Sequence, residues 1–231
     1  MQGMCKRRSR SPKKRDYVAF VLLVMALWHL AGCATDKKVK PTPIIHESAV
    51  PKGPAVVRFE DGRNGFIIME VPQMDEASRR DFELAVVMLN DKEYGRAIEL
   101  LETVIEQSPG VTAPYIDLAI ACQHVGKLEQ AEAYLKTALR LVPEHPVASN
   151  LYGLLFRKTG KFAEARVIYE KAIERFPEYY PMHRNLGVLC DLYLNDPACA
   201  LEQYEIYSQA MPEDQQVKLW ITVLRARLGR N

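Results

Sequence analysis

The sequence lacks the motifs that mark nucleotide-binding and metal-dependent enzymes. No glycine-rich phosphate loop is present, because Gly95, Gly126 and Gly160 fall singly in or beside predicted turns. No histidine pairs with a cysteine or a carboxylate at ligand spacing. The histidines in question are scattered along the chain: His46, His124, His145 and His183. We therefore predict no catalytic residue, no metal and no cofactor, and we do not expect an enzyme.

The chain also lacks a large excess of charge of either sign. It has 31 basic and 29 acidic residues, a formal net charge of +2. Seven of the basic residues and only one acid, Asp16, lie in residues 1–32, which leaves 24 basic and 28 acidic residues in 33–231. The basic excess therefore belongs to the N-terminal segment, and we predict no nucleic-acid partner.

A long hydrophobic run is absent as well. The apolar stretch Val18–Leu30 has 13 residues, whereas a membrane-spanning helix needs about 20. The basic segment Lys6–Arg15 precedes it, and small residues and Cys33 follow it. This order is typical of a signal peptide, which we predict for residues 1–32. The alternative is an uncleaved anchor followed by an incidental cysteine.

The four residues Leu30-Ala31-Gly32-Cys33 resemble the lipobox of bacterial lipoproteins. The resemblance implies that Cys33 is linked to diacylglycerol, becomes the first residue of the mature chain and is N-acylated with a fatty acid such as palmitate. Two lipid signals already suffice for stable anchoring, so three acyl chains would hold the protein on the membrane. In the sorting rule of such lipoproteins, Ala34 in place of Asp implies the periplasmic face of the outer membrane.

Residues 33–54 and 55–72 differ in composition and predict two further segments. Residues 33–54 are rich in proline and charge, which predicts a linker after the lipidated cysteine. Two β-prone runs, Ala55–Glu60 and Phe66–Val71, flank a loop rich in turn-forming residues and predict a β-hairpin. A lone hairpin is marginal in water. It either packs on the helices that follow or offers an edge strand to a partner.

From residue 78 onward the chain repeats. Four alanines mark the repeat, spaced by 34, 34 and 35 residues: Ala97, Ala131, Ala165 and Ala200. A proline follows each of them after twelve residues: Pro109, Pro143, Pro177 and Pro212. A small residue precedes each by twelve residues, or by thirteen in the last unit: Ala85, Ala119, Gly153 and Gly187.

This pattern over residues 78–212 resembles the tetratricopeptide repeat. The resemblance implies an all-α solenoid of about four helix–turn–helix units, with small residues where two helices approach closely. Gly126 and Gly160 suit the turns inside the units, because glycine tolerates positive φ. The amphipathic segment Asp214–Leu228 suits a C-terminal capping helix with a polar outer face. We thus predict a tetratricopeptide domain with its cap over residues 76–231, after a small hairpin.

The resemblance also implies a binding groove lined by the first helix of each unit. The ninth places of the units are apolar: Val86, Ile120, Leu154 and Val188. The fifth places are mixed: Phe82, Ile116, Asn150 and Arg184. The twelfth and thirteenth places are mostly polar: Leu89, Asn90, Gln123, His124, Arg157, Lys158, Asp191 and Leu192. The Lys and Asn set that clamps a carboxylate is absent. We expect a partner protein's helix or extended peptide in this groove, unless the hairpin or the next unit covers part of it.

The cysteines other than Cys33 predict local structure only. Cys122 occupies a core place of its unit and predicts a buried thiol. Cys190 and Cys199 flank the irregular turn Leu192–Pro197 of the fourth unit. In a compartment that permits disulfides they either bond to each other or stay free thiols.

Two functions remain open from the sequence. The first is a lipid-anchored periplasmic scaffold that supports assembly of an envelope machine, such as a pilus, a secretion system or a TonB-type system. The second is an adaptor that regulates a peptidoglycan hydrolase or a protease. Both rest on analogy with proteins of similar architecture, which by itself names no partner.

Overall fold

The computed structural model describes residues 55–58, 65–70 and 73–229. Contacts divide the chain into two units, residues 1–49 and 50–231, and all described residues belong to the second. The predicted signal peptide (1–32), Cys33 and the rest of the linker (34–54) lie outside the described residues. In the part of the chain that the structure describes, no helix is both long and apolar enough to cross a membrane.

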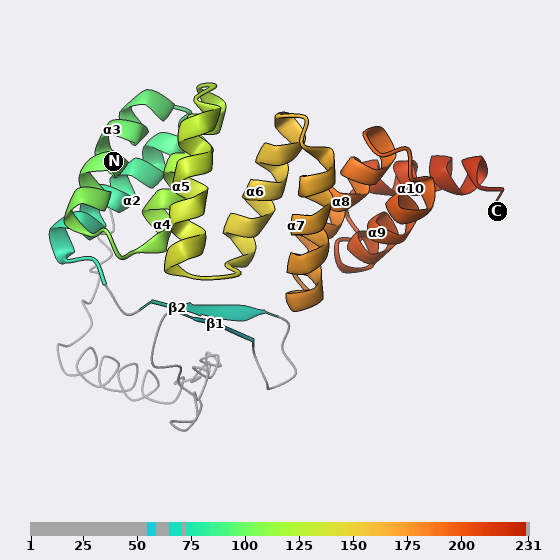
Figure 1. The fold of residues 1–231 in the computed structure, drawn as a ribbon, viewed down its shortest axis with the longest axis horizontal. Coiled ribbons are helices and arrows are strands. Elements are labelled where there is room, and N and C mark those ends of the chain that lie inside the picture. Colours follow the sequence, from blue (N-terminus) through green and yellow to red (C-terminus); the bar gives the residue numbers. More distant parts are fainter. Residues whose placement is uncertain (1–54, 59–64, 71–72, 230–231) are drawn as a thin grey trace, which may run out of the picture. The chain divides into compact units, whose positions relative to one another are not determined.

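Helices dominate the described residues and follow one another in chain order (Figure 1). They are α2 (Glu76–Asn90), α3 (Tyr94–Gln107), α4 (Thr112–His124), α5 (Leu128–Leu141), α6 (Pro146–Lys158), α7 (Phe162–Arg175), α8 (Tyr180–Leu192), α9 (Pro197–Ala210) and α10 (Gln215–Arg227). The repeat prolines Pro109, Pro143, Pro177 and Pro212 each stand two residues after a helix ends. This position is expected, because proline cannot continue a helix.

The helices pack in pairs, α2 with α3, α4 with α5, α6 with α7 and α8 with α9, and each pair packs on the next. The first helices α2, α4, α6 and α8 also contact one another directly, each with the next of the set. Among the described elements, the second helices α3, α5, α7 and α9 have no such direct contacts. The first helices therefore lie on the inner side of a curved stack. This arrangement confirms the predicted tetratricopeptide-like solenoid.

The small repeat residues hold the two helices of a unit close together. Ala85, Ala97, Ala119, Ala131, Ala165 and Ala200 are fully buried. At Gly153, an added Cβ would lie 2.6 Å from the ring of Tyr169, and at Gly187 it would lie 2.5 Å from the ring of Tyr204. These distances leave no room for a methyl group, so the close approach of the helices depends on the small residues.

The turns inside the units follow the prediction in two cases and differ in the fourth unit. Gly126 and Gly160 both adopt φ +79°, in the left-handed region. In the fourth unit Asn195 takes this conformation instead, with φ 49°. Cys190 and Cys199 are joined by a disulfide across this turn, with 6.0 Å between their Cα atoms. Cys122 is a buried free thiol.

The hairpin consists of β1 (Ala55–Arg58) and β2 (Phe66–Met69), paired antiparallel with Val56 opposite Ile68. β2 ends at Met69, before Glu70, whereas the last two residues of the predicted run Ala55–Glu60 and Val71 lie outside the described residues. Phe66 packs with its ring centroid 5.8 Å from those of Phe176 and Tyr179, at the end of α7 and the loop before α8. Figure 1 shows the hairpin along the edge of the stack where the units are joined. It thus packs on the helices, the first of the two roles that the sequence left open.

A glutamate after β2 also fixes the hairpin to the helices. Glu70 Oε1 accepts a hydrogen bond of 3.0 Å from the backbone N–H of Thr112, the first residue of α4. That N–H has no partner inside its own helix, and Val111, the residue before α4, offers no side-chain cap. Glu70 therefore replaces the missing cap from a distant part of the chain.

The last helix, α10, caps the stack, but its outer face differs from the prediction. Val217, Ile221 and Leu224 are buried against α9, as the amphipathic pattern indicates. The exposed side is basic, yet Leu219 is 62% exposed and Val223 is 58% exposed. The prediction of a polar outer face is therefore wrong in part. Helical spacing separates these two apolar residues from the buried stripe, so they cannot share its contacts.

Candidate protein-binding surface on the inner side of the stack

The side chains of α2, α4, α6 and α8 that point away from the second helices form one surface, which we call the inner face. Its ninth-place residues are all half-buried: Val86, Ile120, Leu154 and Val188. Because the repeat period equals the length of one unit, the same place of each unit returns to the same face. The repeat therefore predicts one apolar row on this face, and part of each of its side chains is accessible to a ligand.

The fifth-place residues are less accessible than the ninth-place ones. Ile116 is only 6% exposed and Asn150 only 8%, so both belong largely to the packing between units. Asn150 Oδ1 accepts a hydrogen bond of 2.9 Å from Asn185 Nδ2 in the next first helix. Phe82 and Arg184 are half-buried. Only the latter two leave much side-chain surface for a partner.

Polar residues of the twelfth and thirteenth places contact each other across units. Lys158 Nζ donates to Gln123 Oε1 over 3.2 Å. Two donors of this set, Gln123 Nε2 and Arg157 Nη1, are buried and have no hydrogen-bond partner among the described residues. Unpaired buried donors are costly, and a ligand on the surface could not reach these two atoms unless their side chains moved.

The remaining predicted groove residues lie at the margins of the inner face. His124 is exposed and stacks on Tyr94, with 4.3 Å between the ring centroids. Asp191 lies 3.8 Å from the guanidinium of Arg227, and Arg184 lies 5.5 Å from the ring of Trp220. Leu89 is half-buried, whereas Asn90 and Leu192 are exposed. Near α10 the face is thus partly covered by the cap.

A pocket of about 670 Å³ opens at the end of the inner face nearest the hairpin. Its walls come from β2, from the segment before α2, and from the first two turns of α2 and α4 and the start of α6, with the residues just before α4 and α6. Ile68, Phe82, Ile116 and Val147 supply apolar surface. The fifth-place residues Phe82 and Ile116 therefore line this pocket, and β2 closes one of its sides.

The charged groups of this pocket are mostly acidic. Glu70, Glu83 and Asp117 line it together with one cation, Arg79. The carboxylate of Asp117 forms no hydrogen bond or ion pair with any described residue, and burial raises its pKa to about 6. His145 precedes α6, and its Nδ1 accepts a hydrogen bond of 3.4 Å from the Ala148 N–H. Burial lowers the pKa of His145 to about 4, so at neutral pH it adds no positive charge.

The repeat pattern does not predict the acidic residues of this pocket or its β2 wall. Asp117 is the one carboxylate in the otherwise apolar run of α4, and it is the only local sequence feature that indicates an acidic pocket. The hairpin wall has no local signal, because β2 and α4 are separated by more than 40 residues in sequence and meet only in the folded chain.

The geometry offers no metal site in the described residues. Cys190, Asp196 and Cys199 lie close enough to share an ion. However, the two sulfur atoms are bonded to each other, which removes the thiolates that would bind the metal. What the inner face provides is an accessible apolar row with polar groups at its margins, the chemistry of protein binding.

The comparisons with known proteins define the class. Residues 88–155 match one tetratricopeptide repeat model, and residues 151–179 match a second. The chain therefore contains tetratricopeptide repeats. These are protein-interaction scaffolds, and neither match indicates a catalytic family. A comparison with curated protein sequences found no significant match.

Solved structures with similar folds support the same class. MamA 41-end from Desulfovibrio magneticus RS-1 is 17% identical with a TM-score of 0.58, and the match covers 68% of this chain and 88% of that one. Pseudomonas aeruginosa PilF is 22% identical with a TM-score of 0.61, covering 66% of this chain and 69% of that one. A thermophilic tetratricopeptide protein from Thermus thermophilus is 21% identical with a TM-score of 0.57, covering 64% and 81%. At these identities the likeness extends to the fold alone.

Proposed function

We propose that this protein is a lipid-anchored periplasmic scaffold whose inner face binds a segment of a partner protein during assembly of an envelope machine. The observation that carries the binding part is the row Val86, Ile120, Leu154 and Val188, which runs over all four units and stays half-exposed. Part of each of these side chains is accessible, so a partner that covered the row would bury further apolar surface.

Two features of the inner face favour an extended or helical peptide as the ligand. The apolar row crosses successive parallel helices, so it matches a ligand that lies along the stack. Lys158, beside the row, is exposed, so its ammonium group can donate a hydrogen bond to a backbone carbonyl of such a ligand.

Site-specific crosslinking tests the inner face. A photoreactive amino acid at Ile120 or Leu154 should capture a partner in living cells, identified by mass spectrometry. The triple substitution of Val86, Ile120 and Leu154 by Glu should abolish capture, because it places charge in the apolar contact. Val167→Glu is the matched control, since Val167 is 63% exposed on α7, which is a second helix. Capture that survives the triple substitution contradicts the proposal.

The anchor is proposed from the residues around Cys33. Its test is metabolic labelling with an alkyne fatty acid, followed by fractionation of the membranes. The wild-type protein should take up label and sediment with the outer membrane, and Cys33→Ser should do neither. If Cys33→Ser still took up the label, the fatty acid would be attached at another residue, and the proposed anchor would be wrong.

The kind of machine follows from the captured partner. Structural subunits of a pilus, a secretion system or a TonB-type system support the assembly role. Capture of a peptidoglycan hydrolase or a protease alone contradicts it. The adaptor function would then be tested by measuring the activity of the captured enzyme with and without this protein.

A further inference from the structure

The pocket between β2 and the first helices combines apolar walls with charge of one sign. Its apolar part comes from Ile68, Phe82 and Ile116, and its acidic part comes from Glu70, Glu83 and Asp117. Glu70 is engaged by the backbone N–H of Thr112. Glu83 and Asp117 form no hydrogen bond or ion pair with any described residue, and the single cation Arg79 leaves an acidic excess.

Asp117 is a carboxylate that has no partner in a partly buried position. Its side chain is partly buried, yet it forms no hydrogen bond or ion pair with any residue in the described part of the chain. A desolvated carboxylate without a partner destabilises the folded state. Such a group is typical of a binding site that acquires its counter-charge from a ligand.

We propose that this pocket binds an arginine or lysine side chain of the partner segment, held between the carboxylates of Asp117 and Glu83 with an apolar residue beside it. The proposal rests on the proposed function, because the segment that enters the pocket continues along the inner face. The hairpin then has a role in recognition: β2 supplies the wall against which the aliphatic part of the basic side chain lies.

The size of the pocket and its position favour a side chain of a peptide as the occupant. A volume of about 670 Å³ exceeds that of one ion and suits a long side chain with its neighbour. The pocket shares Phe82 and Ile116 with the predicted groove. A peptide on the apolar row would therefore reach it without a turn.

The test is a titration that needs no knowledge of the partner. Full-length protein in mild detergent, labelled with ¹³C at its isoleucine methyl groups, is titrated with acetyl-leucyl-arginine amide. The methyl signals of Ile68 and Ile116 should shift, and those of Ile173 and Ile206 on the second helices should not. The citrulline dipeptide has the same shape without the charge and should bind about tenfold more weakly. Acetyl-leucyl-glutamate amide should not bind.

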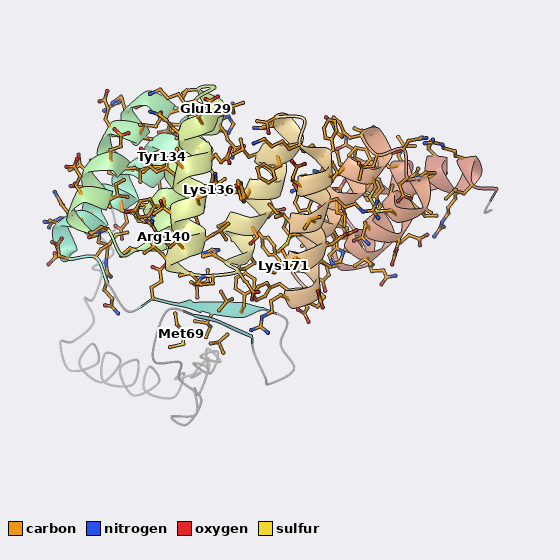
Figure 2. All side chains as sticks on the ribbon, in the orientation of Figure 1. Met69, Glu129, Tyr134, Lys136, Arg140 and Lys171 are labelled. Atoms are coloured by element: carbon orange, nitrogen blue, oxygen red, sulfur yellow. A yellow bond between two sulfur atoms is a disulfide. The ribbon has the colours of Figure 1, made fainter. Side chains whose placement is uncertain are left out.

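Matched variants separate the charge from the fold. Asp117→Asn keeps the size of the side chain and should weaken the arginine dipeptide at least fivefold, with unchanged signals at Ile173 and Ile206. Glu129→Gln removes a carboxylate from the start of α5, at the end of this helix away from the hairpin (Figure 2), and should leave binding unchanged. Equal binding of the arginine and citrulline dipeptides, or no effect of Asp117→Asn, overturns the proposal.

Two further outcomes are distinguishable. The chain's own Lys37, Lys38 and Lys40 carry the same chemistry as the proposed ligand. If their joint replacement by Gln raised the affinity for the arginine dipeptide, the occupant would be this segment, and the proposal of a partner side chain would be wrong. If the dipeptide failed to bind while Ile120 still captured a partner, the pocket inference would fall and the scaffold function would stand.

Discussion

At the scale of single residues, each unit pairs a small residue of its first helix with a larger residue of its second helix. The sizes of the two residues vary together from unit to unit. The first two units pair alanine with leucine: Ala85 with Leu101, and Ala119 with Leu135. The last two units pair glycine with tyrosine: Gly153 with Tyr169, and Gly187 with Tyr204. The larger ring is thus matched by the loss of one methyl group. Cores tolerate such exchanges when the total volume is kept.

This pairing predicts the effect of Gly153→Ala. The new methyl group would overlap the Tyr169 ring, so we expect a loss of about 1–3 kcal/mol in the free energy of unfolding. Adding Tyr169→Leu should restore most of it, because the double variant recreates the pair that the first two units use. Urea unfolding measures both.

Gly95→Ala serves as the control for the glycine substitution. Gly95 lies in α3 with no atom near an added Cβ, so alanine there should stabilise the protein by up to about 1 kcal/mol through helix propensity. If Gly153→Ala were stabilising as well, the contact with Tyr169 would not limit the packing of the third unit.

The isolated carboxylate of Asp117 predicts a pH-dependent stability difference. Its pKa is about 6 in the folded state and 3.8 ordinarily, so the folded protein holds this proton more tightly than the unfolded chain. Stability is therefore lost as pH rises from about 4 to 6, by up to about 3 kcal/mol. Asp117→Asn should be more stable than the wild type at pH 7.5, and this gain should shrink by more than half at pH 4.5.

The neighbouring charges do not reverse this sign. Glu70, Arg79 and Glu83 face the same pocket, and His145 lies beside it. Because the pKa of His145 is lowered to about 4, this histidine stays neutral over most of the range between the two measurements. Thermal unfolding of both proteins at the two pH values gives the difference. A gain independent of pH would mean that Asp117 is not buried in its charged form.

At the scale of elements, the hairpin depends on contacts that the helices provide. We expect Phe66→Ala to lower the free energy of unfolding by about 1–3 kcal/mol through loss of its packing on Phe176 and Tyr179. Glu70→Ala should cost about 1 kcal/mol and speed hydrogen exchange at the start of α4, because the Thr112 N–H loses its acceptor.

Met69→Ala is the comparison for these hairpin variants. Figure 2 shows Met69 on the side of the hairpin away from the helices. This substitution should leave exchange at the start of α4 unchanged. Faster exchange there in Met69→Ala would indicate that the hairpin as a whole, and not the Glu70 contact, protects α4.

Most elements, but not all contacts between them, were predictable from the sequence. The helix pairs, their turns and the small residues were predictable, because each follows from a 34-residue period that repeats residue by residue. The two strands were predictable from β-prone runs around a turn. The docking of Phe66 and Glu70 was not, because neither residue carries a local signal for a contact formed across the chain.

For the candidate site, the repeat predicts which residues share a face but not how accessible each of them is. The ninth-place row lies on one face as the repeat implies, whereas Ile116 and Asn150 are mostly buried between units. Their burial depends on how closely successive first helices approach, which no single unit's sequence specifies. The pocket formed by β2 with α2, α4 and α6 arises only when elements distant in the chain come together.

At the scale of the whole stack, each unit relies on its neighbours to bury its apolar side. The fourth unit packs on α10, where the Tyr204 and Trp220 ring centroids lie 5.2 Å apart and Leu201 is buried near Val217. In a solenoid, stability is close to a sum of unit and interface contributions. Loss of the cap should therefore weaken the nearest unit first and leave distant units little changed.

A stop codon in place of Asp214 tests this expectation, because it removes α10 and leaves the four units. Hydrogen exchange followed by mass spectrometry should show the largest loss of protection in α8 and α9, a smaller one in α6 and α7, and none in α2 and α3. The joint substitution of Leu219 and Val223 by Ser changes the exposed side of α10 only and should preserve protection in α8 and α9. An equal loss over all four units would show that the stack unfolds as one cooperative body, so that a partner bound at any one unit would stabilise every other.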